Sequence, residues 1–418
     1  MQRCIPRASL ALGLALVAAV ASFVIVPGVS SASPGDAAPQ CESHDLTVPS
    51  SVIEGQVVPL PGARLLAGGG DFTIHGSLCL PSGGTPKTVM LALHGITYSN
   101  SYWNSEYQPE TYNFSRHMTD AGYAVFAIDR LGYGQSSKPP AALVTLDSQA
   151  EVAHQVISQL RSGTVGGTAF EHVILVGHSY GTATSWRETA TYNDADAVIG
   201  TGWANTLQTL LVARFFAGFV PAQLDKRFAD RPVGYLTPGP GGREQNYLYD
   251  LSNVDPKMIK YDAEVLQDTV TAAEGATFYN RYGAVPVTYV PTTSEELEIP
   301  LSAQAKDIKI PTFMINGANE LFFCGIDQNH CASSQKLQTE EAKYFSDAAC
   351  FRAAVIPNAG HDLNLQRNAP DTYAVVVTYA NQMLGPDGGN KGSYRASCGA
   401  ISGTDVDSGQ ATFGAIEE

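Results

Sequence analysis

The sequence predicts an α/β protein with a doubly wound, mostly parallel sheet into which a helical cap is inserted. Short apolar runs of strand length alternate along the chain with segments of helical periodicity, which is the order of βαβ units. These runs are apolar throughout, as is typical of strands buried on both faces. The alternation stops after Trp203 and resumes at Ile310, so the residues between them are predicted to be an insertion.

Four apolar runs predict the first half of the sheet. The expected strands are residues 88–95 ("TVMLALHG"), 123–129 ("YAVFAID"), 172–179 ("HVILVGHS") and 195–203 ("ADAVIGTGW"). Helices are expected at residues 112–121 and 180–191. Another is expected to open at the capping box Ser148-Gln149-Ala150-Glu151, because the serine and glutamate side chains of such a box accept hydrogen bonds from orphan backbone donors.

The second half of the core is shorter. Strands are expected at residues 310–317 ("IPTFMING") and 351–360 ("FRAAVIPNAG"), with a closing helix at 371–384. We therefore expect a signal peptide at 1–32, a flexible lead-in and antiparallel hairpins at 33–86, core segments at 87–204 and 301–384, a helical cap at 205–300, and a Gly/Ser-rich tail at 385–418, loosely held except at Cys398.

The N-terminal segment has the pattern of an export signal. Arg3 and Arg7 precede an apolar run of residues 8–26, and the small residues Ser30 and Ala32 follow it. Cleavage after Ala32 would give a secreted protein with no stable membrane insertion. Because the apolar run is long for a signal peptide, an uncleaved membrane anchor is the alternative.

Composition and charge exclude some classes of protein. The chain carries 25 Lys and Arg against 40 Asp and Glu, a formal net charge of -15, which disfavours binding to nucleic acid. With 44% hydrophobic and only 16% charged residues, the chain is expected to bury a core and not to be disordered. No ligand pattern for a metal and no cofactor motif is evident, so we expect neither.

Cysteine usage agrees with export. Of seven cysteines, Cys4 lies in the predicted signal peptide, and an even number remains. An even number in an exported chain predicts disulfides, although six cysteines allow many pairings and free buried thiols are the alternative. The pairing that we expect is Cys41–Cys79, Cys324–Cys331 and Cys350–Cys398.

One serine stands between a predicted strand and a predicted helix. In "GHSYG", residues 177–181, Gly177 and Gly181 permit a sharp turn, because a Cβ at either position would clash with the backbone. This is the G-x-S-x-G pattern of a nucleophile elbow, which lifts Ser179 above the sheet edge. The following helix N-terminus favours developing negative charge. Ser179 is therefore the predicted nucleophile, and the turn is expected to point His178 away from it.

A serine hydroxyl needs a base, and the base needs a carboxylate that fixes its tautomer. Of nine histidines, His361 alone follows the last predicted strand, so it is the predicted base. Glu320, shortly after the strand ending at Gly317, is the predicted acid, with Asp327 as the alternative. Asp362 is expected to brace the loop of His361.

Two backbone N–H groups are needed to hold the oxyanion of an acyl-transfer intermediate. The expected donors are Tyr180, which follows the nucleophile, and Ile96, where Gly95 lets the loop pass close to the serine. Tyr98 and Trp103 come next in this loop and are candidates to bind substrate at the pocket mouth. Aromatic packing at the surface is the alternative interpretation of both.

Taken together, these segments resemble the α/β-hydrolase fold family. The matching stretches are "LALHGIT" (91–97), "AIDRLGYGQS" (127–136), "GHSYG" (177–181), "INGANE" (315–320) and "NAGHD" (358–362), in the order of the family. The resemblance implies Ser179 as nucleophile, Glu320 as acid and His361 as base. Two departures stand out: the acid is glutamate where aspartate is commoner, and the cap matches no familiar pattern.

We therefore expect a secreted serine hydrolase that cleaves carboxylic esters through an acyl-enzyme. The aromatic-rich cap suits a small-molecule or lipid-like ester, with packing inside the cap as the other explanation for its aromatics. A peptidase or amidase, or an acyltransferase, on the same triad is the alternative activity. From a different class, the chain would be a non-catalytic binding module on a hydrolase scaffold.

Overall fold

The computed structural model describes residues 40–54, 70–205, 207–242, 247–280, 305–325 and 329–398. The predicted signal peptide, Asp327 and the end of the predicted tail lie outside these residues. Among the described residues, every helix is too short or too polar to cross a bilayer.

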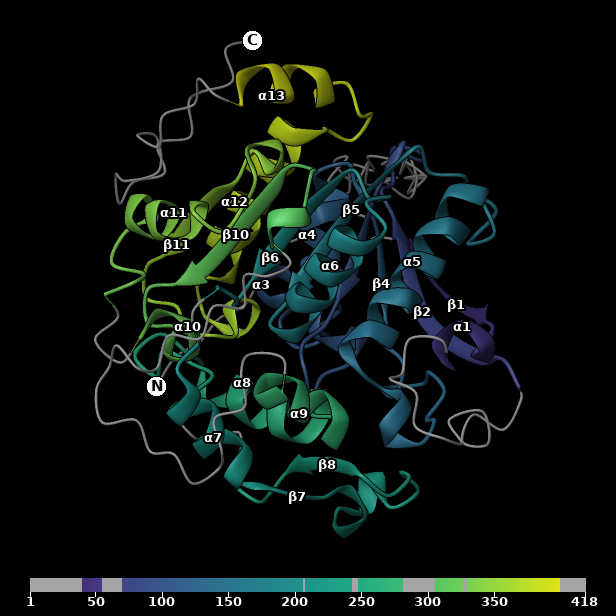
Figure 1. The fold of residues 1–418 in the computed structure, drawn as a ribbon, viewed down its shortest axis with the longest axis vertical. Coiled ribbons are helices and arrows are strands. Elements are labelled where there is room, and N and C mark those ends of the chain that lie inside the picture. Colours follow the sequence, from purple (N-terminus) through teal and green to yellow (C-terminus); the bar gives the residue numbers. More distant parts are fainter. Residues whose placement is uncertain are drawn as a thin grey trace, which may run out of the picture. The chain divides into compact units, whose positions relative to one another are not determined.

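Within the described residues, an eight-stranded sheet forms the centre of the fold, in the order β1-β2-β4-β3-β5-β6-β10-β11 (Figure 1). β2 pairs antiparallel with β1 and β4, and the remaining pairs are parallel. This confirms the predicted doubly wound, mostly parallel sheet. The strands are Gln40–Val48 (β1), Phe72–Leu80 (β2), Thr88–Leu93 (β3), Ala124–Ile128 (β4), His172–His178 (β5), Ala197–Thr201 (β6), Thr312–Gly317 (β10) and Arg352–Ile356 (β11).

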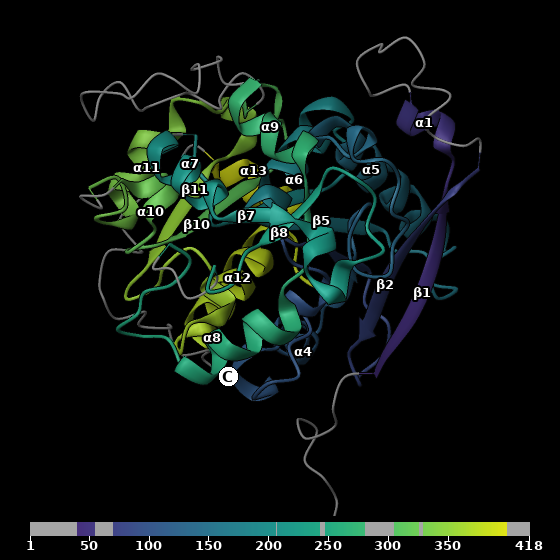
Figure 2. The ribbon, with the colours of Figure 1, turned by 90° about the horizontal axis from the view of Figure 1, so that it is seen from below.

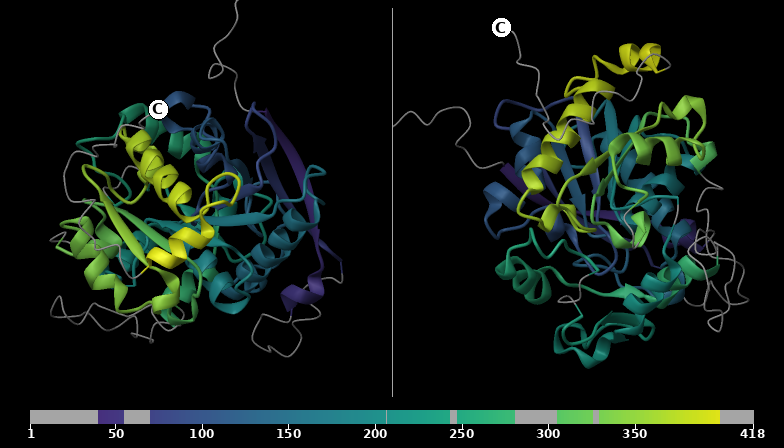
Figure 3. Two further views of the ribbon diagram at one scale, coloured as in Figure 1. Left: turned by 90° about the horizontal axis from the view of Figure 1, so that it is seen from above. Right: turned by 90° about the vertical axis from the view of Figure 1, so that its left-hand side faces the viewer.

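Helices cover both faces of this sheet (Figure 3). α5 and α6 pack together on one face, and α4 and α12 pack together on the other. Every residue of β3 and β4 is buried, which is why these strands read as continuous apolar runs. The core helices are Ser50–Glu54 (α1), Pro109–Tyr112 (α3), Phe114–Asp120 (α4), Leu146–Ser162 (α5), Tyr180–Thr191 (α6), Leu321–Cys324 (α10), Ser334–Ala342 (α11), Ala369–Met383 (α12) and Lys391–Ser397 (α13).

Two helix boundaries differ from the sequence prediction because other side chains cap the helices. α5 begins before the predicted box: Thr145 is its N-cap, and Ser148 is the partner at the third helical position. The expected helix at 112–121 is divided at Asn113, whose backbone is extended and whose side chain accepts from the Arg116 N–H, so that α4 starts there. Both corrections follow from the preference of short polar side chains for N-caps.

Both ends of the described chain are more ordered than the sequence predicted. β1 occupies part of the expected flexible lead-in and pairs with β2 along its whole length. α13 occupies part of the expected loose tail and buries Tyr394. The disulfides explain this order, because Cys41–Cys79 joins β1 to β2 and Cys350–Cys398 ties the end of α13 to the core, while Cys324–Cys331 closes a short loop. These pairs match the expected ones.

The insertion lies at the carboxyl ends of the parallel strands, at the bottom of Figure 1 and toward the viewer in Figure 2. Its helices are accompanied by a three-stranded antiparallel sheet, β7-β8-β9, so the prediction of a purely helical cap is incomplete. Its elements are Thr209–Ala217 (α7), Phe219–Pro221 (β7), Tyr235–Pro238 (β8), Pro256–Tyr261 (α8), Val270–Thr271 (β9) and Ala272–Asn280 (α9).

A buried ion pair joins the insertion to the core. Arg130 Nη1 lies 2.7 Å from Glu274 Oε1 on α9, and both side chains are almost fully buried. The same guanidinium donates to the carbonyl oxygens of His94 (2.8 Å) and Gly95 (3.2 Å). Because a planar guanidinium holds its partners in a fixed geometry, this pair orients the loop after β3 against the insertion.

Candidate active site

Ser179 stands on a sharp turn between β5 and α6. Its backbone has φ 52° and ψ -121°, a conformation that is rare for any residue other than glycine. A Cβ on Gly181 would lie 2.0 Å from the Leu93 carbonyl oxygen, and one on Gly177 would lie 2.4 Å from the Thr182 nitrogen. The turn therefore depends on both glycines, and it holds Ser179 in a strained conformation of the kind that clusters at functional sites.

We expect Gly181→Ala to destabilise the fold strongly, by more than about 3 kcal/mol, because the added Cβ meets rigid backbone. The measurement is the thermal unfolding midpoint, with Gly392→Ala on α13 as the control, since nothing lies within 4 Å of a Cβ at that position. An unchanged midpoint for Gly181→Ala would contradict this account of the turn.

His361 follows β11, and its ring is fixed by Glu320. His361 Nδ1 donates to Glu320 Oε2 at 2.6 Å, and the glutamate side chain is fully buried. Glu320 Oε1 accepts from the Phe322 N–H at 2.7 Å, so the carboxylate also caps α10. A carboxylate that accepts from Nδ1 keeps the proton there and leaves Nε2 as the basic nitrogen. The alternative acid, Asp327, lies outside the described residues.

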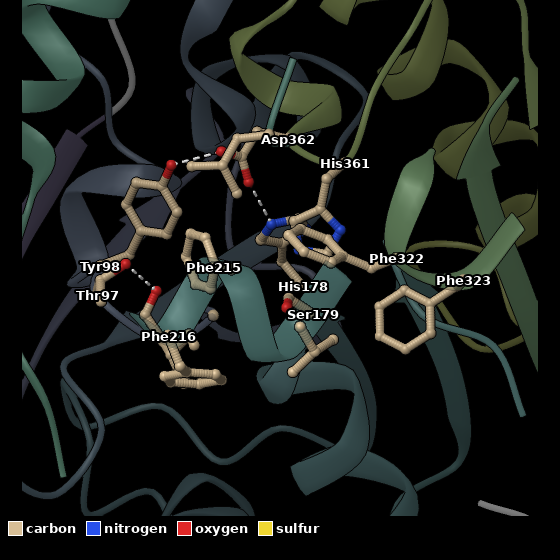
Figure 4. Close-up of a pocket in the computed structure, with 14 residues that line it drawn as sticks. Thr97, Tyr98, His178, Ser179, Phe215, Phe216, Phe322, Phe323, His361 and Asp362 are labelled. Atoms are coloured by element: carbon tan, nitrogen blue, oxygen red, sulfur yellow. Dashed lines mark hydrogen bonds and ion pairs between the residues drawn. The ribbon is translucent and has the colours of Figure 1, made fainter. Parts of the chain in front are cut away.

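Ser179 and His361 line the same pocket (Figure 4). Its walls come from α7, α10 and the loops after β3, β5 and β11. Most of its lining is apolar, and among the described residues that line it there is neither lysine nor arginine. The apolar side chains are Ile96, Val212, Phe215, Phe216, Leu248, Phe322 and Phe323.

One of the two expected oxyanion donors, Ile96, lines this pocket. The other, Tyr180, is the first residue of α6 and directly follows Ser179. A Cβ on Gly95 would come within 3.1 Å of the Ser179 Cβ, so the loop after β3 does pass close to the serine. Thr97 fixes this loop from the other side, because its N–H donates to the Thr269 carbonyl of the insertion at 3.1 Å.

Of the two residues predicted to bind substrate, one lines the pocket and the other does not. Tyr98 lines the pocket, but its hydroxyl donates to Asp362 Oδ2 at 2.6 Å. Trp103 does not line the pocket, so that expectation is wrong. Its side chain is fully buried and packs at 5.1 Å from Tyr102 and 4.8 Å from Phe114, ring centre to ring centre. The apolar indole of Trp103 is stabilised by this packing, so it belongs to the core.

The sequence did not lead us to predict several residues that line the pocket. Phe322 and Phe323 lie two and three residues after Glu320, and their rings lie 5.0 Å and 6.0 Å from the His361 ring. The signal that marks them is the pair of aromatics beside a predicted catalytic acid. Leu248 has no local sequence signal, because only the fold of the insertion brings it to the pocket.

The ring of His178 points toward Asp362, the residue that follows His361 in the sequence. His178 Nε2 donates to Asp362 Oδ1 at 2.9 Å, and both side chains are fully buried. Burial lowers the pKa of His178 below its ordinary value, although the hydrogen bond to Asp362 opposes this effect. Burial therefore favours the neutral form of His178. The expected bracing role of Asp362 agrees with this contact.

Two groups of side chains in the described part of the chain combine three possible metal ligands each. They are His178, His361 and Asp362 at the pocket, and His154, Glu188 and Asp194 between α5, α6 and β6. In the first group each histidine is already hydrogen-bonded to a carboxylate, and in the second His154 Nδ1 donates to Asp194 at 2.6 Å. We assign a metal to neither group.

Comparison with known proteins establishes the family. Residues 90–375, more than half of the chain, match the model of the alpha/beta hydrolase family. The chain belongs to the α/β hydrolase family. This confirms the resemblance that the sequence motifs indicated. The proteins to which this α/β hydrolase is similar include a probable lysophospholipase, a monoacylglycerol lipase and an esterase domain.

Individual relatives of this α/β hydrolase are distant. The probable lysophospholipase BODYGUARD 3 of Arabidopsis thaliana is 31% identical over 78 residues, which is 19% of this chain and 15% of the relative. The probable lysophospholipase BODYGUARD 1 is 33% identical over 102 residues, 24% of this chain and 19% of the relative. The matched part is thus under a fifth of either relative. The solved monoacylglycerol lipase of Paleococcus ferrophilus has 16% identity and a TM-score of 0.45, covering 71% of this chain and 95% of its own.

Proposed function

We propose that this α/β hydrolase is a secreted serine hydrolase that cleaves carboxylic esters through Ser179, His361 and Glu320. The observation that carries the proposal is the 2.6 Å bond between His361 Nδ1 and the buried Glu320, in a pocket that also holds the strained Ser179. A nucleophile, a base and an orienting carboxylate in this chain order are the parts that acyl transfer by a serine requires.

The proposed mechanism begins at His361. With its proton held on Nδ1 by Glu320, Nε2 accepts the Ser179 proton as the serine oxygen attacks the ester carbonyl. The N–H groups of Ile96 and Tyr180 stabilise the oxyanion, and Glu320 stabilises the imidazolium. His361 then protonates the leaving alcohol, and a water molecule, activated in the same way, releases the acid and restores Ser179.

The pocket lining supports a neutral, apolar ester as the substrate. Aromatic and aliphatic side chains from α7 and α10 enclose the space beside Ser179, and no described lining residue offers a cation to a phosphate or carboxylate group. Burial of an apolar acyl or alcohol group against them supplies binding energy at about 25 cal/mol per Å². A lipid-like ester fits this lining.

Secretion is supported by the N-terminal pattern and by the three disulfides, because disulfides persist in oxidising compartments. The leading rival activities are amide hydrolysis and acyl transfer to another alcohol on the same triad. An activity panel separates them: we expect p-nitrophenyl esters to be hydrolysed in water and aminoacyl anilides to be left intact. Turnover of anilides without esters would replace the proposal by a peptidase.

We expect Phe215→Ala to change chain-length preference. Phe215 is buried, lines the pocket and packs at 5.5 Å from Phe322, so its removal enlarges the space for the substrate. The ratio of kcat/KM for long against short acyl p-nitrophenyl esters is expected to rise about tenfold. Phe345→Ala is the matched control, because Phe345 is buried beside Trp186 and Phe351, outside the pocket lining. An equal ratio in both variants would show that Phe215 does not limit the acyl chain.

A further inference from the structure

We infer that Asp362 is a positioning residue that ties together the three loops of the proposed machinery and places a second negative charge beside His361. This inference rests on the proposed function, because it assigns a role to Asp362 only if Ser179 and His361 react. It goes beyond the triad, since the carboxylate of Asp362 hydrogen-bonds His178 and Tyr98, which are not triad residues.

The contacts of Asp362 reach a neighbour of each reacting group (Figure 4). Its Oδ1 accepts from His178 Nε2 at 2.9 Å, and His178 directly precedes Ser179. Its Oδ2 accepts from the Tyr98 hydroxyl at 2.6 Å, and Tyr98 lies two residues past Ile96. Asp362 itself directly follows His361. One carboxylate therefore links the nucleophile elbow, the loop of the expected oxyanion donor and the histidine loop.

The same residue also holds the insertion against the site. The Asp362 N–H donates to the carbonyl of Leu248, a pocket residue of the insertion, at 2.8 Å. The Tyr98 hydroxyl lies 3.3 Å from Asp262 Oδ2, and Asp262 also accepts a hydrogen bond from Tyr249. Through these contacts, Asp362 couples the apolar wall of the pocket to the loops that carry the reacting groups.

Burial makes these hydrogen bonds rigid. Asp362 and His178 have no exposed side-chain surface, and Tyr98 is 2% exposed. In such surroundings an ionised carboxylate is stable only when donors hydrogen-bond to it. Loss of either donor therefore costs more free energy than loss of the same hydrogen bond at the protein surface. The His178 ring is fixed further by stacking on Tyr102 at 4.5 Å and by Thr201 Oγ1, 3.1 Å from its Nδ1.

The charge of Asp362 is close enough to act on His361. A ring nitrogen of His361, a ring nitrogen of His178 and an oxygen of Asp362 lie within 4.8 Å of one another. Other groups that face His361 include the Glu320 carboxylate, hydrogen-bonded to its Nδ1, and the Phe322 and Phe323 rings. Asp262 lies beyond Tyr98. Burial favours the neutral form of His178, so the charge of the pair that it forms with Asp362 is the charge of the carboxylate.

A negative charge at this distance stabilises the imidazolium that forms when His361 takes the serine proton. Removal of the Asp362 charge makes the His361 imidazolium less stable. In the free enzyme, His361 then loses its proton at a lower pH. The acidic limb of the kcat/KM profile is therefore expected to move to lower pH when Asp362 is neutralised. A role confined to folding would not move this limb.

The experiment compares the wild-type protein with Asp362→Asn by ester hydrolysis across pH and by the rate of Ser179 labelling with a fluorophosphonate. We expect kcat/KM and the labelling rate to fall about 100-fold, as misplacement of reacting groups does, and the acidic limb to shift down by about one pH unit. Asp194→Asn is the matched control: Asp194 accepts from His154 at 2.6 Å outside the pocket, so its loss is expected to leave activity unchanged.

Tyr98→Phe separates geometry from charge and keeps the inference testable if Asp362→Asn does not fold. This variant removes one donor and retains the carboxylate, so we expect kcat/KM to fall about tenfold with no downward shift of the acidic limb. Folded Asp362→Asn with wild-type kcat/KM and pH profile would overturn the inference, and so would Tyr98→Phe with wild-type kcat/KM. If the wild-type protein does not label at Ser179, the proposed function fails, and the inference fails with it.

Discussion

Replacement of Ser179 by alanine is expected to abolish ester hydrolysis while the protein stays folded. The hydroxyl is the group that forms the acyl-enzyme. The other hydroxyl side chains of the described pocket lining donate elsewhere, Thr97 to the Ile96 carbonyl at 2.6 Å and Tyr98 to Asp362 at 2.6 Å. Loss of a triad nucleophile lowers kcat by about 10⁵-fold or more. The measurement is steady-state hydrolysis of a p-nitrophenyl ester, with the unfolding midpoint recorded in parallel.

Ser115→Ala is the control for this variant. Ser115 is also a buried serine, but it lies on α4, which does not line the pocket. We expect it to keep wild-type kcat. If Ser179→Ala retained even a hundredth of the wild-type kcat, the ester would be cleaved by another group, and the proposed mechanism would be wrong.

Glu320→Gln is expected to have the second-largest effect. The amide has nearly the shape of the carboxylate and its oxygen still accepts from the Phe322 N–H, so the cap of α10 is retained. It carries no charge to stabilise the imidazolium, and its NH₂ group does not hold the Nδ1 proton. Loss of the orienting carboxylate in such a triad costs about 10⁴ in kcat.

Asp327→Asn tests the alternative acid under the same conditions. We expect kcat of this variant to stay near the wild-type value, because Glu320 already occupies Nδ1 of His361. A large loss in Asp327→Asn together with a small loss in Glu320→Gln would transfer the role of the acid to Asp327.

The elements of the core were predictable because each has a local cause. A run of residues such as Val173–Val176 is apolar on both faces only where helices cover both sides of the sheet. The elbow has a local cause at Gly177, where a Cβ would meet the backbone of Gly181 and Thr182. At Gly181 the cause is the neighbouring strand β3, because a Cβ there would meet the Leu93 carbonyl. The chain order of nucleophile, acid and base then limits the candidates for His361 and Glu320.

Features that depend on distant parts of the chain were not predictable. The burial of Trp103 is one of them, because it packs against Phe114, and Phe114 is in turn packed against Tyr373 of α12. The sheet of β7, β8 and β9 joins segments separated by long connections, and β9 is only two residues long. The pair of Arg130 and Glu274 spans 144 residues of sequence, so neither residue signals the other.

The contacts of Asp362 illustrate both cases. Its place after His361 indicated a bracing residue, since polar groups beside a catalytic loop hold the backbone in position. Its partners, His178 and Tyr98, lie 184 and 264 residues away in sequence, and only the fold brings them to one carboxylate. The shared burial, which decides how much these bonds contribute, follows from the insertion that covers them.

The most direct test of the central claim is covalent labelling of the wild-type protein with a fluorophosphonate, followed by intact mass and peptide mapping. Ester hydrolysis by an activated serine predicts one adduct per chain, located on Ser179, with loss of esterase activity in proportion to labelling. No adduct is expected in Ser179→Ala. An adduct on a different residue, or full esterase activity in a protein completely labelled at Ser179, would contradict the assignment of Ser179 as the nucleophile.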